Sequence, residues 1–244
     1  LGGISPNLAE IKKLAKKYKF RIIEDASHSF GGKFKKKYIG SCKYSDLTTF
    51  SFHAVKTVTS AEGGAITTNS KYLYDKLKLY RENGIVKKKS KRFNDYDQIS
   101  LGLNNRMSEV NASLLKSQLK KYSRFINLRR KIHKRYENFF QKYNIIMQKQ
   151  NNDSVSSHHL LIVVLKNQKV SRDELINLLF KKHNIYTTLH YPLLYKQSLL
   201  KNKFKNLSLK NSEYYSNNAL SLPIHPEIKN KDIKKIFNIL SNYL

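Results

Sequence analysis

The first part of the chain alternates between segments with helical and with strand-like spacing of apolar residues. Residues 5–18 carry apolar side chains at helical spacing, with Ser5 as candidate N-cap and Pro6 at the first helical position. A helix over 71–84, closed by Gly84, is also predicted. An apolar run predicts a buried strand over 20–25, and two further strands are predicted over 47–53 and 63–69. Helices and strands in alternation favour an α/β sheet.

The second part of the chain has a different pattern. A long helix is predicted over about 107–140, and its buried stripe consists of Met107, Val110, Leu114, Tyr122, Phe125 and Ile126. After 151–157 the pattern predicts an α+β region with strands at 158–165 and 185–191 and helices at 171–183 and 230–244. We therefore expect the large α/β domain over 1–125 and a small C-terminal α+β domain over 126–244.

The composition bounds the class of protein. Hydrophobic residues make up 40% and charged residues 26% of the 244 positions, which is typical of a folded globular protein. No apolar run has the length of a membrane span, so no membrane partner is expected. The single cysteine, Cys42, excludes an intramolecular disulfide and a cysteine-based zinc site. We expect no metal and a location in the reducing cytoplasm.

The formal net charge of +30 raises the question of an anionic partner. The lysines are spread from Lys12 to Lys235, and no helix-turn-helix, RRM or zinc-finger pattern accompanies them. We interpret the charge as a compositional bias of solvated positions and predict no nucleic-acid partner. A basic nucleic-acid-binding protein remains the alternative.

Two charged residues follow predicted strands at positions where ligands gather in open α/β sheets. Asp25 ends the strand 20–25, although the polar stretch after it is equally consistent with a simple helix cap. Lys56 follows the strand 47–53, where a desolvated amine could attack a carbonyl to form a Schiff base. A surface lysine with a solvated ammonium is the alternative. An Asp followed about thirty residues later by a Lys fits the ring-nitrogen and Schiff-base pair of pyridoxal phosphate (PLP) enzymes.

Several segments, in this order, resemble the DegT/DnrJ/EryC1/StrS family of PLP-dependent sugar aminotransferases. They are "EDASHSFGGKFKKKYIGS", "FSFHAVKTVTSAEGGAITTN", "LYRENGI", "LGLNNRMSEVNASLLKSQL", "TTLHYPLLYKQ" and "ALSLPIHPEI". The resemblance covers essentially the whole chain. It implies the fold type I of aspartate aminotransferase, with an incomplete large domain, an intact α+β small domain, and a homodimer.

The resemblance also implies roles for individual residues. Lys56 would be the Schiff-base and catalytic lysine, Asp25 would pair with the pyridinium nitrogen, and His28 would contact the cofactor's 3′ oxygen. Ser51 would hold the phosphate.

Residues further along the chain would complete the site. Asn104 would reach the phosphate of the partner subunit's cofactor, with Arg106 supporting the same region. His190 and Tyr191 match a loop on the substrate side, and a satisfied polar residue at a strand end is the alternative for His190.

The resemblance implies a reaction and a substrate class. The lysine block is most similar to that of aminotransferases that act at C4 of UDP-linked 4-keto sugars. The C-terminal part is most similar to the subgroup on the route to pseudaminic acid, and the arabinose-lipid-A aminotransferases are the competing subgroup. The family's sugar 3-dehydratases carry histidine where this chain has Lys56, so transamination is expected, with L-glutamate as amino donor.

The resemblance places Leu1 in the middle of the family's large domain. An upstream segment would supply a phosphate-binding turn and an aromatic ring that stacks on the cofactor. We therefore expect a truncated chain, and an inactive remnant of such an enzyme is the alternative reading.

Overall fold

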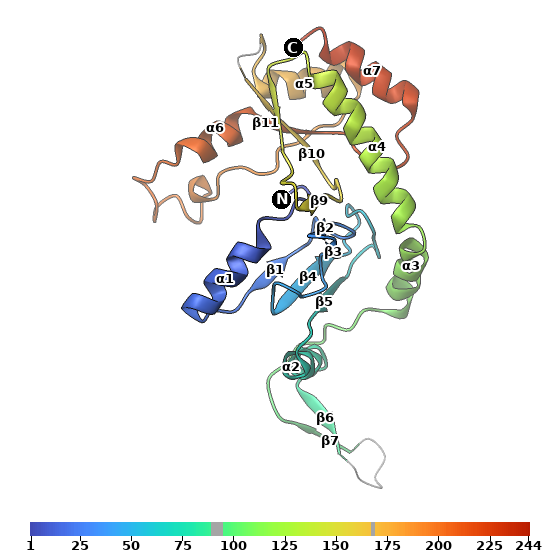
Figure 1. The fold of residues 1–244 in the computed structure, drawn as a ribbon, viewed down its shortest axis with the longest axis vertical. Helices are drawn as coiled ribbons and strands as arrows, with labels where there is room; N and C mark the ends of the chain where they lie inside the picture. Colours follow the sequence, from blue (N-terminus) through green and yellow to red (C-terminus); the bar gives the residue numbers. More distant parts are fainter. Residues whose placement is uncertain (89–94, 167–168) are drawn as a thin grey trace. The chain divides into compact units, whose positions relative to one another are not determined.

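The computed structural model describes residues 1–88, 95–166 and 169–244, which form two compact units (Figure 1). Unit 1 consists of Leu1, Gly3–Ser123 and Asn152–Ser156, and unit 2 consists of Gly2, Arg124–Asn151 and Ser157–Leu244. The change at Ser123 lies close to the predicted domain boundary at 125, but the chain enters unit 1 again at Asn152. The division into a large and a small domain remains a prediction.

The central sheet of unit 1 has the strand order β1–β4–β5. Its strands are β1 (Ile23–Asp25), β4 (Leu47–Ser51) and β5 (Gly64–Thr67). Strands β1 and β4 are parallel, with Asp25 opposite Thr49, and β5 is antiparallel to β4. Because β1 and β4 run in the same direction, their carboxyl ends lie at the same edge of the sheet. This edge holds Asp25 and Ser51.

Helices and short hairpins complete unit 1. They are α1 (Leu8–Tyr18), α2 (Lys71–Arg81), α3 (Glu109–Leu119), β2 (Lys33–Phe34), β3 (Lys37–Tyr38), β6 (Ile85–Lys87), β7 (Tyr96–Gln98) and β9 (Ser154–Val155). The predicted N-cap of the first helix was wrong, because Asn7 rather than Ser5 accepts the N–H of Glu10.

The predicted long helix is two helices, α3 and α4 (Tyr122–Phe140). The buried stripe predicted for it was partly wrong, since Val110 is 79% and Leu114 40% exposed. None of the described residues of α3 is buried, whereas α4 buries residues such as Ile126. Apolar residues recur at helical spacing on both sides of the break, although the two helices do not share a buried face. The periodicity alone therefore did not reveal the break.

Unit 2 is built on an antiparallel sheet in the order β11–β10–β8. Its elements besides most of α4 are β8 (Ile145–Met147), β10 (Leu161–Leu165), α5 (Arg172–His183), η1 (Leu194–Lys196), α6 (Lys210–Asn218), β11 (Ala219–Leu222) and α7 (Asn230–Leu240). A single buried cluster joins sheet and helices, with Tyr136, Leu161, Leu179 and Leu240 almost fully buried within it. The strand predicted at 185–191 was wrong, because the structure has there only the isolated bridge of Thr188 with Ser221.

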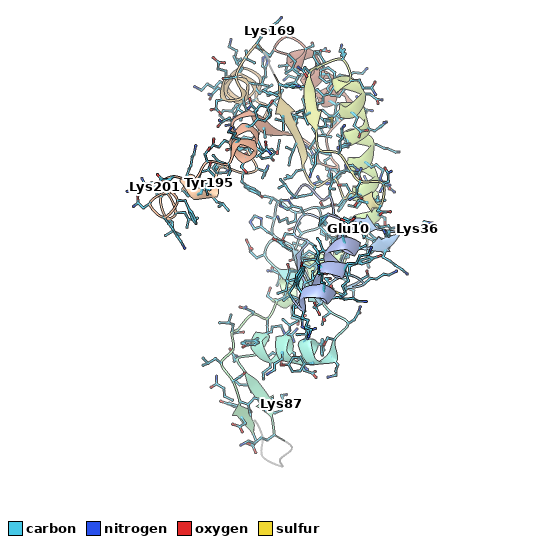
Figure 2. The ribbon with its side chains drawn as sticks, turned by 60° about the vertical axis from the view of Figure 1, so that its left-hand side comes forward. Glu10, Lys36, Lys87, Lys169, Tyr195 and Lys201 are labelled. Atoms are coloured by element: carbon cyan, nitrogen blue, oxygen red, sulfur yellow. The ribbon has the colours of Figure 1, made fainter. Side chains whose placement is uncertain are left out.

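Basic side chains occupy outward positions in both units. Figure 2 shows Lys36 and Lys87 on the hairpins of unit 1, and Lys169 and Lys201 on unit 2, all exposed. Among the residues that the structure describes, none of the helices has the length and apolar character needed to cross a bilayer.

Candidate active site

Asp25 lies at the carboxyl end of β1, where the chain leaves the sheet. Its Oδ1 accepts two hydrogen bonds from Ser27, from the backbone N–H at 3.0 Å and from the hydroxyl at 2.5 Å. These hydrogen bonds lower the pKa of Asp25, and the nearby positive charges of His28 and Lys56 lower this pKa further. Asp25 is therefore a fixed anion at the edge of the sheet.

Lys56 lies in the loop between β4 and β5. Its backbone N–H donates to the His53 carbonyl at 3.0 Å, which forms a tight turn. Partial burial lowers the pKa of the Lys56 ammonium, while the negative charge of Asp25 opposes this shift. These two effects are consistent with an amine that is partly buried and lies within electrostatic reach of the carboxylate.

Ser51 and His28 belong to the same unit as Asp25 and Lys56 and lie close to them in the sequence. Ser51 is the last residue of β4, and its Oγ accepts the N–H of His53 at 3.4 Å. His28 is half-buried, and its charge is felt by Asp25. Ser51 lies at the carboxyl end of a strand, as ligand-binding residues of open sheets do.

Asn104 and Arg106 lie on the extended segment that leads into α3. Asn104 forms an isolated antiparallel bridge with Glu82, and both Asn104 and Arg106 are exposed. A hydrogen bond from Arg81 lowers the pKa of Glu82, and the charge of Arg106 adds to this effect. Exposure leaves both candidate side chains accessible on the surface of unit 1.

His190 and Tyr191 belong to unit 2. His190 Nδ1 lies 2.8 Å from the Ser221 hydroxyl oxygen, and the His190 carbonyl accepts the Tyr215 hydroxyl at 2.5 Å. The His190 and Tyr191 rings meet edge to face at a centroid distance of 4.9 Å. His190 is thus held in place by β11 and α6, whereas Tyr191 is 53% exposed.

The structure brings Asp25, His28, Ser51 and Lys56 into one region of unit 1. Sequence reasoning missed that Ser27 holds Asp25. An Asp followed two residues later by Ser is a common local hydrogen-bonding pattern, so this partnership was detectable in the sequence.

The donor set of this region fits the cofactor that the resemblance implies. PLP presents a ring nitrogen that is protonated opposite a carboxylate, an aldehyde that reacts with an amine, and a phosphate. Asp25 is an anion with a lowered pKa, and Lys56 is an amine with a lowered pKa. Ser51 adds a hydroxyl at the end of the neighbouring strand. A carboxylate, an amine and a hydroxyl are the groups that such a ligand requires.

Comparisons with known proteins show which characterised chains are similar to this one. The chain is 38% identical over 245 residues to a UDP-4-amino-4,6-dideoxy-N-acetyl-beta-L-altrosamine transaminase of Campylobacter jejuni, covering 100% of this chain and 64% of that protein. It is 30% identical over 236 residues to the protein of the same name in Helicobacter pylori, covering 96% of this chain and 61% of the relative. The chain therefore spans somewhat less than two thirds of these relatives.

Solved structures share the fold. Helicobacter pylori PseC, an aminotransferase involved in the biosynthesis of pseudoaminic acid, superposes with a TM-score of 0.88 at 28% identity, covering 99% of this chain and 64% of that one. The PLP form of the Streptococcus pneumoniae putative sugar aminotransferase Spr1654 gives 0.85 at 25% identity, covering 99% of this chain and 66% of that one. The predicted fold class, that of the type I PLP-dependent aminotransferases, is thereby confirmed.

The sequence pattern of the DegT/DnrJ/EryC1/StrS aminotransferase family matches residues 1–241, which is nearly the whole chain. This chain belongs to that family.

Proposed function

We propose that this chain forms most of a PLP-dependent aminotransferase that moves an amino group, from L-glutamate, to C4 of a UDP-linked 4-keto sugar. The observation that carries the proposal is the placement of Asp25 at the end of β1 and of the half-buried Lys56 beyond the adjacent parallel strand β4, where each charge shifts the pKa of the other. The 38% identity to the Campylobacter jejuni transaminase supports this substrate class and a product used for a surface glycan or flagellin sugar of the pseudaminic acid type.

Residues of unit 1 would bind and orient the cofactor. Asp25 would face the ring nitrogen and keep a proton on it, because Ser27 fixes the carboxylate as an anion. His28 would contact the 3′ oxygen and Ser51 the phosphate. PLP, when bound, supplies the aldehyde that accepts the amino group and the conjugated ring that withdraws electrons from the reacting carbon.

Lys56 would be both the attachment point of the cofactor and the group that moves the proton. Its Nζ has a lowered pKa, so a larger fraction of it is neutral near pH 7 than for an ordinary lysine. A neutral Nζ could take up a proton released at the cofactor's C4′ and deliver it to C4 of the sugar. Asp25, as a nearby anion, limits how far the pKa of Lys56 falls.

A second copy of the chain is part of the proposal. The segment that carries Asn104 and Arg106 also exposes Leu101 by 87% and Leu103 by 62%. Burial of large apolar side chains of this kind drives association of subunits. In the homodimer that we propose, this segment would meet the partner, and Asn104 and Arg106 would approach the phosphate of the partner's cofactor.

His190 and Tyr191 would face the sugar nucleotide, and the basic surface would attract its pyrophosphate. We place the reaction in the cytoplasm. No step of the proposal requires a nucleic acid or a membrane.

The proposal is tested by incubating the protein with PLP, L-glutamate labelled with nitrogen-15 and a UDP-4-keto-6-deoxy sugar, and by analysing the sugar by mass spectrometry. The expected result is an amino sugar that carries the label, and its absence when Lys56→Ala replaces the parent protein. Release of the cofactor on dilution, with no labelled product, would instead identify a non-catalytic remnant.

A further inference from the structure

The loop that carries Lys56 is closed at its base by backbone hydrogen bonds. The N–H of Phe52 donates to the Gly63 carbonyl at 2.8 Å, and the N–H of Ser60 donates to the Phe52 carbonyl at 2.9 Å. Val58 and Ser60 are almost fully buried. The position of Lys56 therefore depends on how firmly the two ends of this loop are held together.

The carbonyl of Glu62, near the C-terminal end of this loop, is the acceptor through which helix α3 is hydrogen-bonded to the loop. It accepts the Ser60 hydroxyl at 2.9 Å from within the loop and the side-chain amide Nδ2 of Asn111 at 3.0 Å from helix α3. A carbonyl oxygen has two lone pairs, so these two donors use its full acceptor capacity. The contact from Asn111 spans 49 positions of sequence and is the long-range member of the pair.

The start of α3 is itself well placed to act as an anchor. The Ser108 hydroxyl caps the helix by accepting the backbone N–H of Asn111 at 3.2 Å. Met107 packs so closely on Gly63 that a Cβ added to this glycine would lie 2.6 Å from Met107 Cε. Met107 and Asn111 thus contact the loop from two successive turns of chain.

We propose that Asn111 is a positioning residue for Lys56, because its amide holds the Glu62 carbonyl and thereby keeps the lysine loop closed against α3. This inference rests on the proposed role of Lys56 as the reactive amine. The segment just before α3 carries Asn104 and Arg106. The hydrogen bond from Asn111 would therefore connect the loop of Lys56 to the segment that would contact the cofactor of the partner subunit.

The side-chain pair of His53 and Glu62 does not account for the closed conformation of the Lys56 loop. His53 Nε2 lies 3.6 Å from Glu62 Oε1, and both side chains are largely exposed. Exposed pairs of this kind contribute little. The amide of Asn111 binds the backbone of Glu62, so a Glu62→Ala variant removes the ion pair and keeps the anchor.

The experiment measures the reactivity of Lys56 without any cofactor. The parent protein and its variants are treated with a trace of acetic anhydride from about pH 6 to about pH 12, a range that brackets the ordinary lysine pKa. Peptide mass spectrometry then gives the pKa of each lysine amine. The variants are Asn111→Ala, Asn111→Asp, which keeps the size but removes the donor, and Glu62→Ala. Asn69→Ala is the matched control, because the Asn69 amide also donates to a backbone carbonyl, that of Ser41, at 3.0 Å.

The expected result is a rise of the Lys56 pKa toward that of an exposed lysine in both Asn111 variants, because the loosened loop lets water reach the amine. Hydrogen exchange at the Phe52 and Ser60 amides should become about fivefold faster, which corresponds to loss of one hydrogen bond. Glu62→Ala and Asn69→Ala should leave both measurements unchanged.

An unchanged Lys56 pKa in the Asn111 variants, or an equal change in Asn69→Ala, would overturn the proposal. Both readouts are independent of turnover. A protein that shows the expected shifts but fails to aminate a sugar would contradict the proposed function and leave the positioning role in place.

Discussion

The two units differ in how they are packed, and the candidate active site lies in the unit with the smaller buried cluster. Unit 2 surrounds one apolar cluster to which α4, α5, α7 and its sheet all contribute. Beside the central sheet of unit 1 the buried cluster consists of Ala26, Phe50, Phe52 and Val58, while Ile23 and Ile66 of the sheet are 65% and 48% exposed. The proposed cofactor-binding residues and the larger apolar cluster therefore lie in different units, so their contributions should be separable by mutation.

The largest separable effect is expected at Asp25. Asp25→Asn removes the anion that keeps the ring nitrogen protonated, so kcat should fall about 10²- to 10³-fold, as when other fixed electrostatic partners are removed, with a smaller change in KM. Steady-state kinetics of the parent and the variant provide the measurement.

Asp46→Asn is the matched control, because Asp46 is also a carboxylate of unit 1 with a lowered pKa, held mainly by the Ile22 N–H. It should cost stability and leave kcat within a few-fold. If Asp25→Asn ran at the parental rate, Asp25 would be only a cap of the strand end.

A substitution in the apolar cluster of unit 2 should have the opposite result, because it should lower stability and leave the chemistry intact. Leu179 is fully buried, and Leu179→Ala should lower the free energy of unfolding of unit 2 by about 3 kcal/mol, because it creates a cavity. Urea unfolding measures the loss. Leu199→Ala is the control at a leucine that is 91% exposed, and it should change the stability by less than about 0.5 kcal/mol. Equal effects of the two variants would show that this cluster does not carry the stability of unit 2.

The next effect is a loss of stability of unit 2 at acidic pH. Burial, helped by the neighbouring charges of His133, Arg130 and Arg129, lowers the pKa of His158 from 6.5 to about 3 in the folded protein. Between these values the unfolded chain binds a proton that the folded chain does not, so the stability of unit 2 falls as the pH falls. The slope should approach about 1.4 kcal/mol per pH unit.

His158→Asn should flatten this dependence. Asparagine has no titrating group and tolerates the positive φ of 49° at this position. Urea unfolding at several pH values below neutrality measures the slope. A variant that kept the parental slope would show that other groups, such as His133, cause the acid sensitivity.

The sequence indicated candidate site residues more readily than the connections between elements. Asp25 and Lys56 stand at or just after the ends of apolar runs, a pattern that is visible without a structure, whereas Ser51 was named from the family resemblance. The roles of these residues remain a prediction. The short strands β6 and β7 were missed, because three-residue segments such as Tyr96–Gln98 carry too few positions for a period to show.

Contacts between distant segments were outside the reach of pattern analysis. The amide of Asn111 meets the Glu62 carbonyl across 49 positions, and nothing local in either segment indicates it. The break between α3 and α4 was missed for a related reason, because burial against other elements, rather than spacing, decides which apolar residues are covered.

The central claim is that Lys56 is the reactive amine of the site, and borohydride reduction tests it most directly. The protein is mixed with PLP at no more than one equivalent, reduced, digested and mapped by mass spectrometry, with Lys56→Arg and Lys43→Arg treated in parallel. The account predicts a pyridoxyl group on Lys56 in the parent and in Lys43→Arg, and its loss in Lys56→Arg. A pyridoxyl group on another lysine, with Lys56 unmodified, would contradict the account.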